Sequence, residues 1–527
     1  MGRTRHDTTL RAAELRDLLG PRNDPFVLES AVDPVAPSEF DERPPATGCA
    51  EFAAEAGPFR TYRRRVEWRR IEAHPTDATP DGSGGDRYEV SESAEWHLGF
   101  PYWRWIYDPL FKRKALAELP PGTQPWWLFP DRLSPHQATV VSAMALFNVV
   151  GGIIFGMLTQ VMTFVSADIG DGSAGQQTTV FAAVRIGTVL TFAALALSDS
   201  AGRRRIALAC CWIAVVATLA TAVAPSLLAF TAFQLVARNV SIAALIAIDT
   251  IVVEELPPGS RAMAVGLGTL AYGLGAGTAV VALPLADLGS GGWRFVYGLG
   301  VLAIPLIISG ARHLPESSRF TAMRVETTSG EAPKRRVRGS RFALLAGLFV
   351  LVNVFVAPAS QLQNDYLRVE QGYSGLTITL LILTTSIPGA IGVMAGGRLA
   401  DTRSRRWTIV VGLLATATFG SVFYSLSGAA MWASALFASV LGAITVAPLG
   451  VLGAELFPTS RRGGARGALS VVAVSGSVIG LLSAGALTDT LGFGPAFALL
   501  AIGPLIAAAL AFAVPETRGR TLEQLNE

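Results

Sequence analysis

Three charged residues inside strongly apolar stretches are the first candidates for chemistry in this sequence: Arg185, Arg238 and Asp249. A charged side chain at mid-membrane costs about 2.5–3.5 kcal/mol on insertion scales, so such residues usually face a cavity, a partner or a substrate. Two cations and one carboxylate predict a cavity wall for an anionic substrate and, in Asp249, a group that can couple transport to protons. The alternative is that Arg185 extends to the membrane surface while the other two have structural roles.

The spacing of Arg238 and Asp249 limits how they could act together. They lie 11 residues apart, about three helical turns, so a helix would place both on one face. Along the helix axis they would be separated by about 16 Å, which is too far for a direct ion pair. We therefore expect separate roles for the two residues.

Amide side chains in the same apolar stretches could complete a substrate site. Each has the alternative of an ordinary hydrogen bond between helices. The candidates are Asn148, Gln160, Asn353, Gln361 and Asn364.

The elements that must position these residues are membrane helices. Of the 527 residues, 51% are apolar and 16% charged, whereas soluble proteins carry about 25% charge. This composition excludes a disordered chain and an ordinary soluble enzyme, and a net charge of +3 gives no support for nucleic-acid binding. Spans of about 20 residues cross a bilayer. We predict twelve: 138–165, 179–198, 206–223, 227–252, 262–285, 294–310, 342–362, 375–397, 407–426, 429–453, 467–488 and 492–514.

Lys and Arg between the predicted spans indicate the orientation. With residues 1–133 in the cytoplasm, 21 of the 25 basic residues after position 133 fall in cytoplasmic connections or the tail. Only Arg294 and Arg368 fall in outer connections, and Arg185 and Arg238 lie within spans. Since cytoplasmic loops are enriched in Lys and Arg, we expect a multi-pass plasma-membrane protein with both termini in the cytoplasm.

Residues 1–133 form a polar extension with 18 basic and 22 acidic side chains. It has no apolar core of a signal peptide. Residues 1–57 suggest irregular structure, whereas 61–74 and 87–98 around a Gly-rich turn predict a hairpin. Aromatic and basic residues at 101–114 and 125–132 suit a membrane interface. We expect a tethered docking or regulatory segment with a cytoplasmic protein partner; the alternative is a small folded domain packed under the helices.

An internal repeat divides the apolar body into two halves. "EELPPGSR" at 254–261 recurs as "AELFPTSR" at 454–461, and "LPESSR" at 314–319 as "VPETRG" at 514–519, both with an offset of 200. A six-span unit has therefore been duplicated. We expect bundles at 134–320 and 342–527, joined by a basic cytoplasmic linker at 321–341.

Charged residues in the cytoplasmic connections also recur in both halves. Their charges could hold helix ends together in one conformation and release them in another, although single exposed pairs contribute only about 0–1 kcal/mol. The alternative is simple anchoring and helix capping. The candidate gating residues are Asp199, Gly202, Arg203, Arg204, Glu255, Arg261, Asp401, Arg405, Arg406, Glu455 and Arg461.

These motifs resemble the major facilitator superfamily, and within it the sugar-porter-like branch. "GRLADTRSRR" (397–406), "PESSR" (315–319) and "PETRGRTLEQL" (515–525) stand in the family's order. The resemblance covers about 134–527 and implies two six-helix bundles around a central cavity, working by alternating access. It also implies that Arg238 matches the family's span-4 arginine. Leu158 stands where sugar porters typically have an aspartate, which puts proton-coupled hexose uptake by the usual residues in doubt.

Together these observations predict a secondary transporter of a small polar metabolite, with an organic anion favoured slightly over a sugar. Proton coupling is a hypothesis. An exporter of metabolites or drugs with the same fold is one alternative. A ligand-binding sensor or scaffold that signals through residues 1–133 is another. We expect no enzyme activity and no cofactor; Cys49, Cys210 and Cys211 have no metal-binding spacing.

Overall fold

The fold is described from a computed structural model. The described residues are 2–24, 26–32, 44–71, 86–113, 116, 125, 127–129, 131–257, 260–316, 339–455 and 462–516. The chain forms two compact units. The first comprises Met1–Asn148, Ala247–Ala271 and Ile308–Thr321, and the second comprises Val149–Ile246, Tyr272–Ile307 and Ala322–Glu527.

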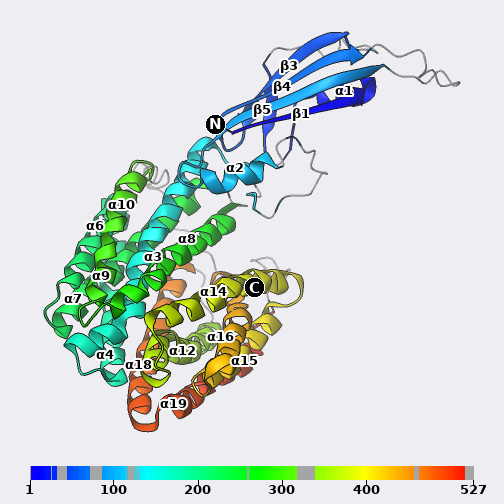
Figure 1. Cartoon of the computed structure of the whole chain (residues 1–527). Coiled ribbons are helices and arrows are strands. Elements are labelled where there is room, and N and C mark those ends of the chain that lie inside the picture. The colour runs from blue at the N-terminus through cyan, green and yellow to red at the C-terminus, as the bar shows by residue number, and fades with distance from the viewer. Residues whose placement is uncertain are drawn as a thin grey trace, which may run out of the picture. The chain divides into compact units, whose positions relative to one another are not determined.

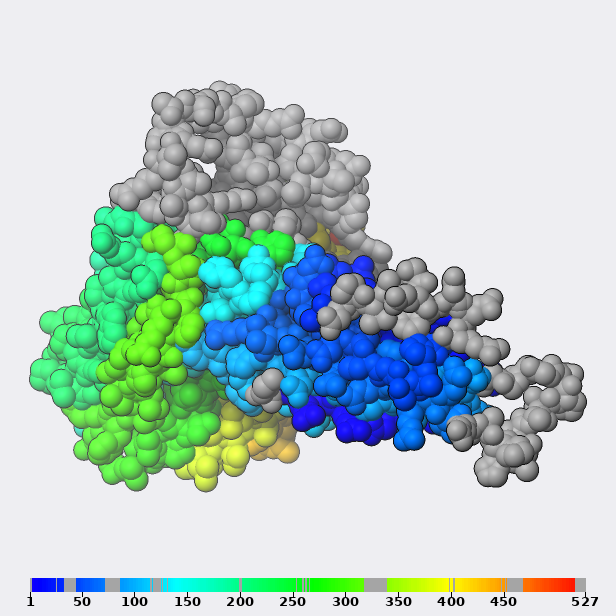
Figure 2. All heavy atoms as spheres, turned by 90° about the horizontal axis from the view of Figure 1, so that it is seen from above, coloured from blue at the N-terminus to red at the C-terminus, as the bar shows by residue number. Residues whose placement is uncertain are grey.

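The first unit contains an antiparallel sheet near the N-terminus. Its five strands lie in the order β1-β5-β4-β3-β2, so that the first strand pairs with the last. Figure 1 shows the long strands side by side, and Figure 2 shows their atoms, in blue, as one closely packed surface. The elements of this domain are β1 (Gly2–Arg11), α1 (Ala12–Leu18), β2 (Leu28–Ala31), β3 (Thr47–Ala56), β4 (Phe59–Ile71), β5 (Arg87–Leu98) and α2 (Arg104–Lys112).

Alternation along the two central strands builds the core of this sheet. In β5, every second side chain from Tyr88 to Leu98 is buried, as expected where one face of a sheet is covered. On that face α1 inserts Leu15, which packs against Phe52, Val66 and Trp68. The helix α1 therefore covers part of this face, and Phe111 of α2 packs against Trp96 nearer its other end.

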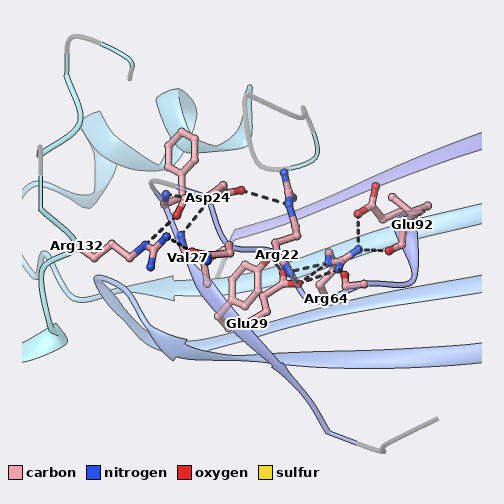
Figure 3. Close-up of polar contacts among 12 residues, drawn as sticks. Arg22, Asp24, Val27, Glu29, Arg64, Glu92 and Arg132 are labelled. Carbon is pink, nitrogen blue, oxygen red and sulfur yellow. Dashed lines mark hydrogen bonds and ion pairs between the residues drawn. The ribbon is translucent and has the colours of Figure 1, made fainter. Parts of the chain in front are cut away.

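One inward position of β4 holds a charge, Arg64, and its side chain is fully buried. Its guanidinium donates to both carboxylate oxygens of Glu29 at 2.8–3.0 Å and to Glu92 Oε1 at 3.2 Å. It also donates to the carbonyls of Leu18 and Gly20 and lies 4.3 Å from the Phe52 ring centroid. Figure 3 shows Arg64 between its two carboxylates. This satisfied cluster ties α1, β2, β4 and β5 together.

The N-terminal domain corrects part of the sequence prediction. The predicted hairpin is present as β4 and β5, paired antiparallel, and residues 72–74 of the prediction lie outside the described structure. The irregular structure expected for 1–57 is wrong, because these residues supply β1, α1, β2 and β3. The folded domain that was the alternative is therefore what the structure contains.

The membrane body agrees with the predicted number of spans. The described residues contain twelve helical segments long and apolar enough to cross a membrane. Several are interrupted and carry more than one label. In chain order they are α3 (Pro135–Ile169); α4 (Ala174–Ile186) with α5 (Thr188–Ala201); α6 (Arg203–Ala222); α7 (Leu227–Glu255); α8 (Arg261–Val281) with η4 (Leu283–Asp287); α9 (Trp293–Gly298), η5 (Leu299–Leu302) and α10 (Ala303–Ala311); α12 (Gly339–Gln361), α13 (Gln363–Asp365) and η6 (Tyr366–Glu370); α14 (Gly375–Thr402); α15 (Arg405–Phe423); α16 (Gly428–Ala443) with α17 (Val446–Glu455); α18 (Arg462–Leu491); and α19 (Phe493–Leu500) with α20 (Ile502–Ala511).

Equivalent helix crossings occur in the two halves of the body. A Cβ at Gly275 of α8 would collide with the carbonyl of Val149 on α3. A Cβ at Gly476 of α18 would lie 2.7 Å from the carbonyl of Val350 on α12. Both pairs differ by 201 positions, which matches the repeat in the sequence. Glycine is needed at each crossing because the two backbones approach so closely.

Candidate functional site

Arg238 lies on α7 in an aromatic environment. Its guanidinium carbon is 3.5 Å from the ring centroid of Phe155 on α3, and the residue is only 6% exposed. Arg185 of α4, Tyr272 of α8 and Tyr297 of α9 are close enough to interact with it electrostatically. We call these five residues the arginine cluster.

The arginine cluster has cations without matching anions. Among the described residues, no carboxylate interacts with either guanidinium group. Within the described part of the chain, Arg185 Nε and the Tyr297 hydroxyl are buried without a hydrogen-bond partner, as is the hydroxyl of Thr159, one turn from Phe155 on α3. Since buried polar atoms are normally hydrogen-bonded, the cluster can accommodate an anionic ligand with hydrogen-bonding groups.

Asp249, the third charge predicted within the spans, belongs to the first unit. Asn148 of α3 approaches it with its Nδ2 3.5 Å from Asp249 Oδ1, and also donates to the carbonyl of Met144 at 3.1 Å. The carboxylate therefore has one weak amide contact between α3 and α7. The structure brings together Asn148 and Asp249 of the predicted site.

A cavity of about 390 Å³ lies in the second half of the body, and none of its lining residues is charged. Most of the groups in it that could contact a ligand are hydroxyl groups and aromatic rings. The lining residues include Phe355, Ser360, Gln363, Thr385, Ser386, Thr416, Phe423, Tyr424, Ser439 and Thr445, from α12 to α17. This volume and lining suit an uncharged, hydroxylated group.

One end of the body carries the odd-numbered connections, those that follow the first, third, fifth and later odd-numbered spans. Amide side chains join the two halves of the body at this end. Asn364 Nδ2 donates to the carbonyl and to Oε1 of Gln160 at 2.8 and 2.9 Å. Gln177 Nε2 donates to Asp365 Oδ1 at 2.6 Å. Asn364, Asp365 and Gln177 are each at most 4% exposed. Two predicted site residues, Gln160 and Asn364, therefore meet in a contact between the two halves.

An ion pair continues the same contact. Arg368 Nη1 donates to Asp287 Oδ1 at 2.7 Å, and the Gly375 amide donates to the other oxygen at 2.6 Å. The Arg368 guanidinium also lies 3.8 Å from the Phe164 ring centroid. We call this end the interlocked end. It comprises residues 160–177, Asp287 and residues 361–375.

The seventh span is broken where it reaches the interlocked end. The α-helix α12 contains Pro358 and ends at Gln361, and Tyr366–Glu370 form a π-helical turn. Such irregular turns are frequent at functional sites. The break places Asn364, Asp365 and Arg368 toward the first half of the body.

The other predicted amides act within their own helix or lack a partner. Asn353 Nδ2 donates to the carbonyl of Phe349 at 2.9 Å. Gln361 is 4% exposed, and its Oε1 has no hydrogen-bond partner in the described structure. Neither residue is joined to the arginine cluster by a contact that the structure records.

The predicted gating residues are only partly covered by the structure. Arg461 and the side chains of Asp199, Arg261, Asp401 and Glu455 lie outside what is described. At the start of α15, Glu516 accepts from the backbone amides of Arg405 and Arg406 at 3.2 and 3.4 Å and from the Ser404 hydroxyl. A carboxylate at a helix N-terminus is stabilising. The motif around Glu516 therefore caps the ninth span.

The N-terminal domain is bonded to helix ends within the first unit. The Tyr102 hydroxyl donates to the Ser309 carbonyl at 2.6 Å and lies 2.6 Å from Nδ1 of His313. Trp103 Nε1 donates to the carbonyl of Ser142 at 3.3 Å, and the Asp131 amide donates to the Ser260 hydroxyl at 3.0 Å. These bonds reach α3, α10 and the connection between α7 and α8.

Arg132 joins the sheet domain to the start of α3. It donates to the carbonyl of Asp24 at 2.8 Å and to Asn23 Oδ1 at 2.5 Å, as Figure 3 illustrates for Asp24. Asp24 in turn pairs with Arg22 at 3.3 Å. A polar path therefore leads from the domain to the first membrane helix.

Sequence reasoning missed several residues of these contacts. Charges are common at span ends, so the sequence did not single out Asp287, Asp365 or Arg368 as candidate site residues. One usable signal was present: Arg294 and Arg368 are the two basic residues in the odd-numbered connections, and both are bonded. Arg294 donates to the carbonyls of Ala222 and Ala224 at 3.1 and 3.0 Å.

Comparisons with known proteins agree with this architecture. The model of the Major Facilitator Superfamily matches residues 359–527. The putative metabolite transport protein YwtG of Bacillus subtilis (strain 168) is 23% identical over 430 residues, which cover 72% of this chain and 93% of that protein.

Solved structures give the same result for the fold. The inward-open xylose transporter XylE from E. coli has a TM-score of 0.62 at 14% identity, covering 74% of this chain and 99% of that chain. A bacterial homolog of the human lysosomal transporter Spinster, inward-facing and unoccupied, has a TM-score of 0.59 at 15% identity, covering 72% and 97%. Residues 359–527 thus match the Major Facilitator Superfamily, and the twelve-span body shares the fold of these solved transporters.

Proposed function

We propose that this protein is a secondary transporter that moves a small organic anion by alternating access, with the negative group bound between Arg185 and Arg238. One observation carries the proposal: two guanidinium groups within membrane spans have no carboxylate partner among the described residues. A bound anion would compensate both charges. The similarity to a metabolite transport protein and to a xylose transporter supports a sugar or metabolite substrate.

The uncharged cavity supports a second feature of the substrate. Its hydroxyl groups and aromatic rings suit a hydroxylated carbon chain or ring, as in a sugar acid. A neutral sugar would use this cavity without needing the arginine cluster. An organic anion is therefore favoured over a neutral sugar, because it would use both the arginine cluster and the uncharged cavity.

We place the interlocked end on the outer side of the plasma membrane and both termini in the cytoplasm. The distribution of Lys and Arg supports this orientation. In it, the bonds of Asn364, Asp365 and Arg368 close the outer side, so the described conformation is one in which substrate cannot leave outward. The cytoplasmic motifs would then close the opposite side in the other conformation.

Asp249 is the coupling carboxylate in the simplest version of this proposal. It lies on the same helix as Arg238, and among the described residues its carboxylate has one long amide contact, with Asn148. Uptake by an Asp249→Asn variant that kept its full dependence on a pH gradient would eliminate this role. Export, including drug export, is an alternative direction for the same cycle.

The first experiment is thermal stabilisation of the purified protein by gluconate, citrate, xylose and tetraphenylphosphonium. A ligand of the folded state stabilises by about 2.7 kcal/mol at a hundredfold excess over its Kd. We expect stabilisation by a carboxylate and its loss in Arg238→Gln and Arg185→Gln. Arg205→Gln, an exposed arginine at the start of α6, is the matched control and should keep the response. Stabilisation by xylose or the phosphonium alone would contradict the anion proposal.

The folded N-terminal domain favours a second candidate, a ligand-binding sensor. Its bonds to α3, α10 and the connection before α8 could transmit a change in the membrane body to the cytoplasm. Deletion of residues 1–130 distinguishes the two functions. A transporter should keep flux of the stabilising ligand into proteoliposomes, whereas a sensor would bind ligand without flux in either form.

A further inference from the structure

Asp365 is a buried carboxylate at the contact between the two halves of the body. It is 3% exposed and accepts a hydrogen bond from Gln177 Nε2 at 2.6 Å. Gln177 is fully buried, and its Oε1 accepts from the Thr163 hydroxyl at 3.3 Å. The carboxylate belongs to the second half, whereas both hydrogen-bonding partners belong to the first.

The charges that face Asp365 are unfavourable for a second negative charge. Asp489 of α18 and Glu370 of η6 both interact with it electrostatically, and both are acidic. Tyr424, just after α15, also interacts with it electrostatically, while its hydroxyl donates to the carbonyl of Ala359. Arg368 lies on the next turn, but its guanidinium is engaged with Asp287. Within the described ranges, no basic side chain pairs with Asp365.

Burial of this carboxylate in its ionised form is costly without a cation. Protonation removes the charge and leaves the hydrogen bond from Gln177 possible. Opening the interlocked end would instead expose the group to water, where ionisation is favourable. The closed and open states of this end therefore differ in their affinity for a proton.

We propose that closure of the interlocked end takes up one proton on Asp365. The proton comes from outer water to a carboxylate oxygen as the end closes, and it returns to water as the end opens. No other bond is made or broken. This inference rests on the proposed alternating-access function and gives the interlocked end a proton-binding group of its own, in addition to the coupling carboxylate proposed for Asp249.

The test measures the opening of this end directly and needs no substrate. Spin labels on Val223→Cys and Leu491→Cys, which are 75% and 51% exposed, report the distance between the halves. Cys49, Cys210 and Cys211 are first replaced by alanine. In proteoliposomes, we expect the short distance at acidic pH and a growing population of a longer distance as pH rises. Asp365→Asn should remain short at every pH.

Two further variants separate a proton-binding role from a structural one. Gln177→Leu removes a donor that stabilises the ionised carboxylate in the closed state, so Asp365 should keep its proton to higher pH. The change from the short to the longer distance should therefore occur at higher pH than in the parent protein. If Gln177 and Asp365 only held the end together, Gln177→Leu would instead favour the longer distance at every pH. Asp171 is an exposed carboxylate at the same end, and Ser173 hydrogen bonds, chiefly from its backbone amide, hold the pKa of Asp171 below its usual value. Asp171→Asn should leave the transition unchanged.

Three outcomes would overturn the proposal: an unchanged transition in Asp365→Asn, a transition lost in Asp249→Asn instead, or no pH-dependent distance in the parent protein. None of these outcomes bears on anion binding, which the stabilisation assay tests separately. Conversely, failure of carboxylates to stabilise the protein would leave the distance measurement interpretable. Thermal melts of each variant confirm that it is folded.

Discussion

Two buried arginines, one in the sheet domain and one in the membrane body, have opposite surroundings. Arg64 is enclosed by Glu29, Glu92 and two backbone carbonyls, so every nitrogen of its guanidinium has a partner. Arg238 faces an aromatic ring and a second arginine. Burial of a charge alone therefore does not identify a binding site. A compensated charge belongs to the fold, whereas an uncompensated one is available to a ligand.

The largest expected effect is the loss of the compensated cation. Arg64→Met would leave Glu29 and Glu92 buried without their cation, which destabilises a protein by about 3–5 kcal/mol. Urea unfolding of the full-length protein, followed by the fluorescence of Trp68 and Trp96, measures this loss. Arg65→Met is the control, because Arg65 is half exposed and water screens its ion pairs. Equal losses in the two variants would contradict the comparison.

A smaller effect is expected where the two regions are bonded together. Tyr102→Phe removes the hydroxyl that reaches Ser309 and His313, at a cost of about 1 kcal/mol. Hydrogen exchange should become faster in α2 and at the end of α10, with β4 unchanged. Tyr107→Phe retains the ring that stacks on Phe100 at 4.5 Å and serves as the matched control. Faster exchange throughout the sheet would indicate that Tyr102 supports the domain itself.

Removal of the uncompensated cation should hardly affect stability. Without ligand, Arg238→Gln loses a cation–π contact of about 0.5–2 kcal/mol but also relieves the burial of an unpaired charge. We expect a net change within about 1 kcal/mol, measured by thermal unfolding in detergent. A loss as large as that of Arg64→Met would show that Arg238 is structural.

The smallest effect concerns pH. Burial raises the pKa of Glu92, and the Arg64 guanidinium opposes this shift only in part. A carboxyl group with a raised pKa favours the folded state below its ordinary pKa, and this contribution is lost as pH rises through the raised value. The domain should therefore lose stability over that window. Glu92→Gln should weaken this pH dependence in melts followed by tryptophan fluorescence, whereas a steeper dependence would contradict the assigned direction.

The sequence predicted the twelve spans because long apolar runs rarely form anything but membrane helices. It singled out Arg238 as a candidate because a charge inside such a run is conspicuous, and its role as a site residue stays a prediction. The sheet domain was harder. In β4, Arg64 alternates with outward-facing arginines, and a sequence of many arginines does not reveal which one points inward. Edge strand β1 has little apolar alternation, since only Leu10 is packed against the core. Asp365 was missed because contacts across the halves depend on the three-dimensional arrangement of distant spans.

The order of strands in the sheet has a consequence for biosynthesis. The first strand pairs with the fifth, and β5 ends at Leu98, before α3 begins at Pro135. At about 5–20 residues per second, translation needs roughly 2–7 s to reach α3, and antiparallel sheets close within milliseconds to seconds. The nascent domain can therefore complete its sheet before the first membrane helix leaves the ribosome. A domain already folded at that moment would oppose translocation of the N-terminus and so favour one direction of membrane insertion.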